Sequence, residues 1–255
     1  MSTPSHWHDR VAVITGAGSG LGREFARLGA REGMRLVLAD VQVDALHAVR
    51  DELVALGARV EAQTVDVADA AEVDALAGMA WDRFGAVHLL FNNAGVGCAG
   101  LIWENPLQDW AWCLGVNLWG VVHGMRSFVP RMLDAARASQ DYRATVVNTA
   151  SMAGLLNPPT SGVYNVTKHA VVSLSETLHH DLALVTDQVR CAVLCPYYVP
   201  TGIHASERNR PQRFSCDAAP THSQQVAHAM VEKAVRSGRV DAADVARITF
   251  DALRA

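Results

Sequence analysis

Lysine is scarce in this 255-residue chain: it occurs only at Lys168 and Lys233, and arginine supplies nearly all the other positive charge. The 22 basic and 26 acidic side chains give a formal net charge of −4, which provides no electrostatic basis for binding nucleic acid or an anionic membrane. The chain also lacks an apolar run of the roughly 20 residues that a membrane-spanning helix needs. Its first ten residues, MSTPSHWHDR, are polar and are not typical of a signal peptide.

Cysteine is also infrequent, and the five cysteines (98, 113, 191, 195 and 216) show no paired spacing. This pattern favours reduced thiols and a cytoplasmic location. Histidines occur at 6 and 8 in the polar N-terminus and side by side at His179 and His180. Neighbouring residues on a helix point in different directions, so no metal site is expected.

Short apolar runs alternate along the chain with longer segments of helical periodicity. The expected strands are 11–15, 35–39, 59–65, 87–91, 144–149 and 189–194, and the expected helices include 21–32, 43–56, 70–84 and 241–254. The strands are apolar without alternation, as in parallel strands covered on both faces. This order predicts an α/β fold, a three-layer doubly wound Rossmann fold with a parallel sheet of six to seven strands. Asp69 and Glu72 predict a capping box for the third helix.

No repeat, low-complexity tract or linker divides the chain, so a single domain over residues 1–255 is expected. Residues 202–222, GIHASERNRPQRFSCDAAPTH, are polar and without pattern, which is typical of a substrate lid or a mobile loop. The arginines of this segment (208, 210 and 213) could attract an acidic substrate. We favour the alternative, a solvated loop surface.

The first expected strand leads into TGAGSGLG, residues 15–22. Glycines let a backbone approach a pyrophosphate, and the helix that follows offers free N–H groups and partial positive charge. No Gly-Lys-Ser/Thr follows, which excludes a nucleoside-triphosphate loop. The sequence therefore predicts a dinucleotide site, with a tight glycine turn that binds no ligand as the alternative.

Asp40 ends the second expected strand about 20 residues past the glycine loop, where dinucleotide folds place a ribose-binding carboxylate. Such a carboxylate accepts from both ribose hydroxyls and repels a 2′-phosphate. Neither Ser19 nor Val41 is basic. NAD is therefore predicted over NADP, and Asp40 can also cap the helix that begins near residue 43.

Tyr164 and Lys168 stand four residues apart, on one face of an expected helix. A nearby ammonium lowers a phenol pKa from its ordinary value near 10, so the phenol can act as acid toward a ketone or as base toward an alcohol. A compact ammonium can also hydrogen-bond a ribose, where a planar guanidinium fits poorly. An exposed pair without chemistry is the alternative. Ser151 favours a site, because it follows a strand at the sheet edge that gathers ligands.

Together these motifs resemble the short-chain dehydrogenase/reductase family, in its compact single-domain branch. Three residues separate Gly16 from Gly20, as in that branch, and NNAG (92–95) matches a second signature. Asn117 in VNLWG matches the catalytic asparagine, and Ser151, Tyr164 and Lys168 follow in the family's order and spacing. The resemblance covers about residues 10–201.

The resemblance implies a role for each matched residue. Tyr164 is the proton donor and acceptor, and Lys168 lowers its pKa and binds the nicotinamide ribose. Ser151 orients the substrate oxygen, Asn117 holds a water that relays protons, and the nicotinamide gives or takes the hydride. The implied cofactor contacts are Gly16, Ser19, Gly20, Leu21, Gly22, Asp40, Asp66, Val67, Asn93, Ala94, Gly95, Tyr164, Lys168, Pro196, Val199 and Thr201.

Two features depart from the family. In PYYVPT (196–201), Tyr197 stands where glycine is usual, which should reshape the substrate side. Relatives usually continue past the last helix with a seventh strand, whereas this sequence stops at Ala255.

The sequence thus predicts an NAD-dependent oxidoreductase that interconverts a secondary alcohol and its ketone. The expected lining, which includes Ile102, Trp103, 154–159 and 197–198, favours a hydrophobic or aromatic small molecule. A non-catalytic dinucleotide-binding sensor is the alternative, but all four catalytic positions are filled. The glycine spacing and the lack of a substrate domain exclude a sugar epimerase or dehydratase. By resemblance, a homo-oligomer (tetramer or dimer) packs through helices 106–136 and 162–185. Trp110 and Trp112 fall on the first of these helices, and at least one of them is expected in the core or at a subunit interface.

Overall fold

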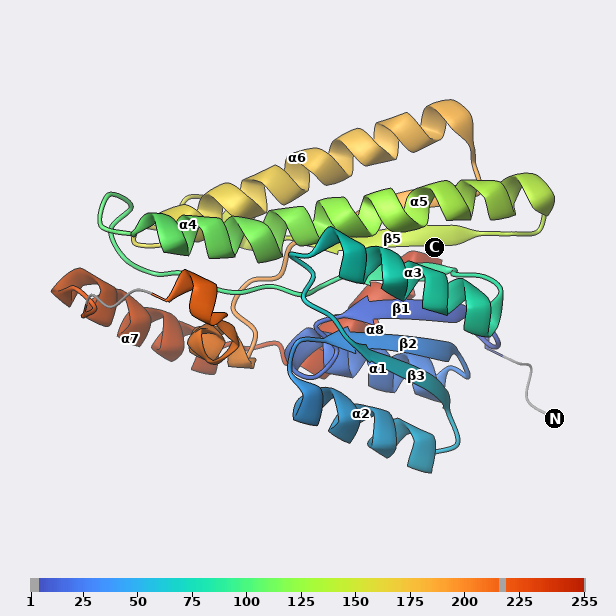
Figure 1. The fold of residues 1–255 in the computed structure, drawn as a ribbon, viewed down its shortest axis with the longest axis horizontal. Coiled ribbons are helices and arrows are strands. Elements are labelled where there is room, and N and C mark those ends of the chain that lie inside the picture. The colour runs from blue at the N-terminus through green and yellow to red at the C-terminus, as the bar shows by residue number, and fades with distance from the viewer. Residues whose placement is uncertain (1–4, 216–218, 255) are drawn as a thin grey trace.

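A single sheet of six parallel strands forms the centre of the computed structural model, which describes residues 5–215 and 219–254 (Figure 1). The strands are β1 (Val11–Thr15), β2 (Arg35–Asp40), β3 (Arg59–Thr64), β4 (Leu89–Asn92), β5 (Ala144–Thr149) and β6 (Val189–Leu194). Their order is β3-β2-β1-β4-β5-β6, so the chain reverses direction across the sheet between β1 and β4. A crevice forms at such a reversal, outside the carboxyl ends of the strands. The predicted doubly wound α/β fold is confirmed, with six strands in the described ranges.

The strands were predicted as buried, which is correct only for the middle of the sheet. All residues of β1 and β4 are buried, whereas β3 and β6, at the two edges, are largely half-exposed or exposed. An edge strand has one neighbouring strand and less helical cover, so its outer side chains reach solvent. The apolar content of a strand's sequence did not show whether the strand lies in the middle or at an edge of the sheet.

Two layers of helices cover the sheet (Figure 1). One face carries α3 (Ala70–Phe84), α4 (Leu107–Leu114), α5 (Gly120–Ala138) and α6 (Gly162–Val185), and the other carries α1 (Gly20–Arg31), α2 (Val43–Ala55) and α8 (Ala242–Arg254). Val13 and Phe128 belong to the apolar core under the first layer, and Phe25 and Phe250 to the core under the second. No helix within the described ranges combines the length and apolar character that a membrane crossing requires.

The long helix predicted over 106–136 is interrupted. Between α4 and α5 the backbone forms a π-turn, Gly115–Trp119, with Asn117 at its centre. A π-turn widens the helix and shifts the carbonyls out of the ordinary i to i+4 pattern, and such turns are frequent at functional sites.

The predicted capping box at the start of α3 is only half formed. The Asp69 side chain accepts from the N–H groups of Ala71 and Glu72, as expected of a cap. The Glu72 carboxylate accepts instead from the N–H of Asp66, at 2.7 Å. The glutamate therefore holds the turn after β3 rather than closing the reciprocal pair.

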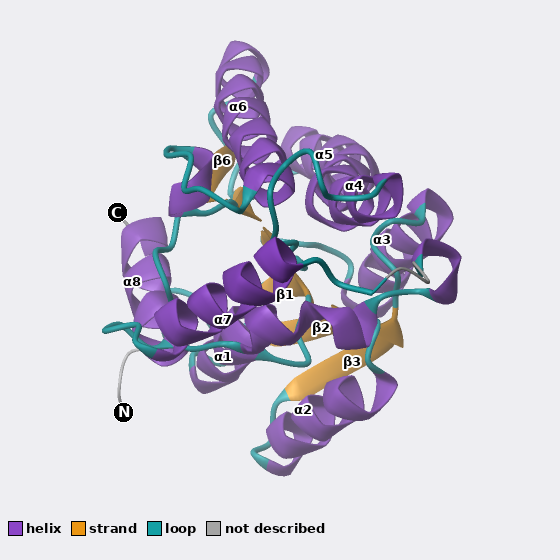
Figure 2. Cartoon of the chain, turned by 90° about the vertical axis from the view of Figure 1, so that its left-hand side faces the viewer, coloured by secondary structure: helices purple, strands orange, loops and turns teal. Residues whose placement is uncertain are grey.

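Residues 202–222 are more regular than the sequence predicted. Gly202–Asn209 and Gln212–Phe214 form short 3-10 helices, and a further helix, α7 (His222–Arg236), follows. In Figure 2 these turns and α7 lie in front of the strand ends. Residues 216–218 of this segment, including Cys216, fall outside the described ranges.

Candidate active site

The glycine loop joins β1 to α1 and has the shape that a dinucleotide requires. Gly16 and Gly20 have φ values of +66° and +54°, in the left-handed region that favours glycine. A Cβ on Gly22 would lie 2.2 Å from the carbonyl oxygen of Gly16, so only glycine permits this close approach. Ser19, the residue before α1, makes no side-chain cap bond to the helix. The N–H groups of the first turn thus have no side-chain cap there, which suits an anionic ligand.

Asp40 lies beside this loop at the end of β2. Its Oδ2 accepts from the N–H of Gly18 at 2.8 Å, and its Oδ1 accepts from the N–H of Gln42 at 2.9 Å. The second bond holds the turn before α2 and is not a helix cap, because the N-cap of α2 is Gln42 and the first-turn N–H groups receive no side-chain cap. The predicted capping role of Asp40 is therefore wrong. Each carboxylate oxygen has a further lone pair, so the two bonds leave capacity for ribose hydroxyls.

Thr15 brings the NNAG segment next to the glycine loop. Its Oγ1 accepts from the N–H groups of Asn93 and Ala94, at 3.0 and 3.1 Å, and donates to the carbonyl of Phe91. The Asn93 amide in turn donates to the Thr15 carbonyl at 3.0 Å. Thr15 was not predicted as a site residue. Thr15 stands at the end of a buried strand and beside the end of another strand. This position was the available signal that Thr15 belongs to the site.

Three of the four predicted catalytic side chains lie together at the carboxyl ends of β5 and β6. Tyr164 and Lys168 occupy the first two turns of α6, and Ser151 follows β5. The Lys168 Nζ donates to the Thr149 carbonyl at 2.8 Å and lies 5.6 Å from the centre of the Tyr164 ring. The Ser151 Oγ donates to the Pro196 carbonyl at 3.5 Å and accepts from the N–H of Ala153.

The electrostatics of this group differ from the sequence-based expectation. Burial raises the pKa of Tyr164 to about 12, while the hydrogen bond from Ser151 acts in the opposite direction. Burial lowers the pKa of Lys168 to about 8. The lowered tyrosine pKa predicted from Lys168 is therefore wrong for the protein without bound cofactor, because desolvation outweighs it and the ammonium faces the Thr149 carbonyl.

Asn117 is fully buried, and its amide has protein partners on both atoms. Its Oδ1 accepts from the N–H of Val96 at 2.8 Å, and its Nδ2 donates to the Val96 carbonyl at 2.9 Å and to Thr167 Oγ1 at 3.1 Å. Asn117 thus fixes the backbone next to Gly95, where an added Cβ would come within 3.6 Å of the Lys168 Nζ. These contacts use the amide N–H donors and one lone pair of the Oδ1. The water relay that the resemblance implies for Asn117 stays a prediction.

The segment after β6 forms the opposite side of the site. Thr201 lies against the glycine loop, since a Cβ on Gly20 would be 3.2 Å from the Thr201 Cβ. Tyr197, the unusual residue at the family's glycine position, is 66 % exposed and packs edge-on against Tyr198. The two phenol rings therefore stand at the rim of the site and do not fill the space for the amide of a nicotinamide.

One cavity of about 590 Å³ joins these elements. The predicted site residues that line it are Gly16, Ser19, Gly20, Leu21, Asp40, Asp66, Val67, Asn93, Ala94, Gly95, Ser151, Tyr164, Lys168, Pro196, Val199 and Thr201. Gly22 and Asn117 do not line it. Their roles are to permit the tight turn and to fix the wall.

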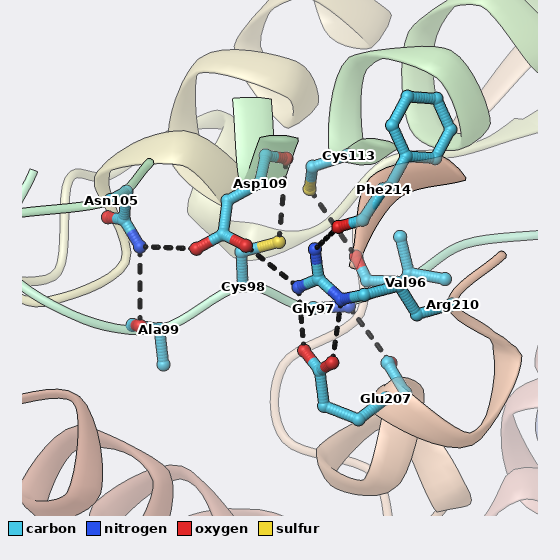
Figure 3. A network of polar contacts seen from close by, with 11 residues as sticks. Val96, Gly97, Cys98, Ala99, Asn105, Asp109, Cys113, Glu207, Arg210 and Phe214 are labelled. Carbon is cyan, nitrogen blue, oxygen red and sulfur yellow. Dashed lines mark hydrogen bonds and ion pairs between the residues drawn. The ribbon is translucent and has the colours of Figure 1, made fainter. Parts of the chain in front are cut away.

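The solvated loop surface that we favoured from the sequence is correct for Arg208 and Arg213, which are exposed, and wrong for Arg210. Arg210 is largely buried and pairs with Asp109 at 2.8 Å (Figure 3). Arg213 is more exposed and pairs with Asp66, a predicted adenine contact, at 2.7 Å. Arg208 lines the cavity. The Arg210–Asp109 pair was missed because 101 residues separate its members.

Other titratable groups do not gather into a metal site within the described ranges, where no three His, Cys, Asp or Glu side chains are placed to hold an ion. Trp112 is 1 % exposed, in keeping with the expectation that one of the two tryptophans belongs to the core. It also lines the cavity, which the sequence did not indicate.

The chain is similar to a known protein family and to solved structures. Residues 10–212 match the family described as short chain dehydrogenase. A solved short-chain dehydrogenase/reductase from Burkholderia phymatum, in complex with NAD, is 54 % identical with a TM-score of 0.94, over 97 % of this chain and 86 % of that one.

Two curated relatives are also similar. The 1-deoxy-11-beta-hydroxypentalenate dehydrogenase of Streptomyces exfoliatus is 40 % identical over 77 % of this chain and 70 % of its own length. The cyclohexanol dehydrogenase of an Acinetobacter species is 34 % identical over 78 % of this chain and 76 % of its own length.

Proposed function

Because this chain belongs to the short-chain dehydrogenase family, we propose that it is an NAD-dependent dehydrogenase that interconverts a hydrophobic secondary alcohol and its ketone. One observation carries the proposal: the glycine loop with Asp40, and the group Ser151, Tyr164 and Lys168, line the same cavity. A dinucleotide bound along the loop would therefore have the phenol at its far end. When bound, the nicotinamide supplies or accepts the hydride.

The loop and Asp40 favour NAD as the cofactor. Two backbone N–H groups hold the Asp40 carboxylate in a fixed orientation at the cavity wall. A 2′-phosphate would meet this negative charge, and the neighbouring wall residues Ser19 and Val41 offer no positive charge to offset it. The similarity to a chain solved with NAD supports the same choice.

Tyr164 is the proposed general acid and base. With a pKa of about 12 the phenol is protonated at neutral pH, which suits proton donation to a ketone oxygen. Ser151 supports the same oxygen, since its hydroxyl can turn its single proton from the distant Pro196 carbonyl, at 3.5 Å, toward the phenol or the substrate. Lys168 uses one of its three N–H donors on Thr149, so two remain for a ribose and for proton exchange.

The cavity wall near the phenol supports a hydrophobic substrate. It is formed mainly by apolar and aromatic side chains, namely Cys98, Trp112, Met152, Leu156, Tyr197, Tyr198 and Ile203. Apolar walls with a few polar groups are typical of small-molecule sites. The similarity to a cyclohexanol dehydrogenase supports an alcohol as the reacting group.

Replacing Tyr164 with phenylalanine tests the mechanism. A panel of secondary alcohols that includes cyclohexanol is screened for NADH absorbance, and Tyr164→Phe should lose at least about 10²-fold in turnover, since it lacks the transferable proton. NADH affinity, measured by fluorescence, should stay near the wild-type value. Tyr142→Phe is the matched control, because Tyr142 is also a buried phenol but donates to the Val87 carbonyl, away from the cavity.

Turnover by Tyr164→Phe within tenfold of wild type would remove the phenol from the mechanism. If wild type binds NADH but converts no alcohol or ketone, the protein is a dinucleotide-binding sensor and not an enzyme of this kind.

The choice of NAD over NADP has its own test. Asp40→Asn keeps an acceptor for Gly18 but removes the charge, so the NAD-to-NADP preference should fall at least about tenfold. An unchanged preference would refute the ribose assignment.

A further inference from the structure

The segment from Gly202 to Phe214, here called the lid segment, has little internal structure to hold it in place. It consists of two short 3-10 helices, and Ala205 interrupts the first with non-helical angles. Within those two helices only Ser206 is buried. Helices this short are not stable alone, so contacts with the rest of the molecule must fix the segment.

The lid segment forms a wall of the cavity and crosses the carboxyl ends of several strands. Its cavity-lining residues are Gly202, Ile203, His204, Ser206, Arg208, Asn209 and Pro211. Polar contacts tie it to the turn after β2 (Asn209 to Gln42), to the turn after β3 (Arg213 to Asp66) and to the loop after β4 (Ser206 to the N–H of Gly97). The lid segment is thus attached to three turns and loops at the carboxyl ends of the strands, beside the cavity.

Arg210 adds a further attachment, which is the more buried of the two ion pairs that tie the lid segment to the rest of the molecule (Figure 3). Its Nη2 donates to Asp109 Oδ1 at 2.8 Å, and its Nε donates to Glu207 Oε2 at 2.7 Å. The guanidinium also lies 4.2 Å from the centre of the Trp112 ring. The side chains of Arg210 and Asp109 are 13 % and 11 % exposed, against 56 % for Arg213.

The partner of Arg210 is itself rigidly held. Asp109 lies in the first turn of α4, and its Oδ2 accepts from the Asn105 amide at 3.1 Å. Trp112, which the guanidinium covers, lies on the same helix and lines the cavity. Breaking a buried ion pair leaves an uncompensated charge, whereas an exposed pair such as Arg213–Asp66 contributes little. Arg210 is therefore the attachment on which the closed position depends most.

We propose that Arg210 is a positioning residue that latches the lid segment onto Asp109 of α4 and so limits the rate at which NAD(H) leaves the cavity, an inference that rests on the proposed NAD-dependent function. If only the closed form retains the dinucleotide, the apparent dissociation constant rises in proportion as the closed fraction falls. Arg210 need not touch the dinucleotide for this effect.

The test compares Arg210→Met, Arg210→Lys and Asp109→Asn with wild type. Stopped-flow displacement of NADH should give a dissociation rate at least about tenfold higher for Arg210→Met, with an intermediate rate for Arg210→Lys, because an ammonium keeps the charge but not the forked contact. The double variant of Arg210→Met with Asp109→Asn should release NADH about as fast as Arg210→Met alone, since both changes remove one contact.

Limited trypsin digestion of the NADH-free proteins gives a readout that does not depend on the cofactor. Cleavage after Arg208 and after Arg213, followed by mass spectrometry, should be faster in Arg210→Met if the lid segment opens more often. Arg137→Met is the matched control, because that guanidinium also pairs with a carboxylate, Asp134, but on an exposed helix end. It should change neither readout.

Unchanged NADH release and unchanged cleavage in a folded Arg210→Met protein would overturn the latch. Faster cleavage without faster release would overturn it as well, because lid opening would then not limit cofactor exit. If the wild-type protein binds no NADH, the proposed function fails instead, and the tryptic cleavage alone still decides whether Arg210 holds the lid segment.

Discussion

Replacing Lys168 with methionine should stabilise the cofactor-free protein by about 2 kcal/mol at pH 7, although it should abolish turnover. Lys168 is 3 % exposed, and within the described ranges no carboxylate forms an ion pair with it. Its pKa falls from the ordinary value near 10.5 to about 8, mainly through burial. That difference corresponds to about 3 kcal/mol of cost for keeping the ammonium charged, and the lost hydrogen bond to Thr149 returns about 1 kcal/mol.

Urea unfolding without cofactor measures this effect, and the chain supplies a matched control. Lys233, the other lysine, is exposed on α7, so Lys233→Met removes the same charge without a desolvation cost. The pH dependence follows from the depressed pKa of Lys168. Above about pH 8 the folded state releases the proton while the unfolded chain keeps it, so wild-type stability rises relative to Lys168→Met up to the ordinary lysine pKa.

The sign of the difference in unfolding free energy between Lys168→Met and wild type shows whether burial destabilises the ammonium. If Lys168→Met unfolds at lower urea than wild type at pH 7, the ammonium is stabilised in place and burial is not its dominant energy. A constant difference between the two proteins from pH 7 to pH 10.5 would show that Lys168 does not titrate in this window. Either result would show that burial of the Lys168 ammonium does not destabilise the folded protein.

Two further predictions concern stability away from the reaction. In thermal unfolding, Gly124→Ala should lower the free energy of unfolding by about 3 kcal/mol, because the new Cβ would lie 2.0 Å from the buried Asn92 Oδ1. Gly78→Ala is the control in the same assay. Gly78 also lies within a helix, but its nearest contact is at 3.8 Å, so this change should be neutral or stabilising. His88, whose Nδ1 accepts from the N–H of Val11, has a pKa lowered to about 4 by burial. Its contribution to the free energy of unfolding is complete above the ordinary pKa of 6.5 and is lost as pH falls through 4. Urea unfolding of wild type should therefore lose about 3 kcal/mol more than that of His88→Asn over this range, and equal losses would contradict the assignment.

The framework of the fold could be predicted because its signals are local. Continuous apolar runs marked the strands to within two residues at each end, and the family membership inferred from the ordered motifs is confirmed. The helix α7, which was not predicted, did carry a local signal. Thr221 and Gln224 form a reciprocal capping box at its start, in the Thr-x-x-Gln pattern that marks a helix N-terminus.

Contacts between residues far apart in the sequence could not be predicted from the sequence. Arg208, Arg210 and Arg213 look alike in a polar segment, yet only Arg210 meets a buried carboxylate. Glu72 matched the spacing of a capping box but bonds to Asp66, because the turn after β3 comes within its reach. Spacing shows which groups are able to meet locally, and it does not rank them against partners elsewhere in the chain.

The sequence by itself determined the order of strands and helices, the glycine turn after β1, and which residue types stand at the carboxyl edge of the sheet, because these follow from backbone preferences and apolar periodicity over a few residues. Only the tertiary structure decided the energies of those residues. Burial raises the pKa of Tyr164 and lowers that of Lys168, and it removes most of the Arg210–Asp109 ion pair from solvent. Desolvation depends on everything that packs around a group, which no short stretch of sequence contains.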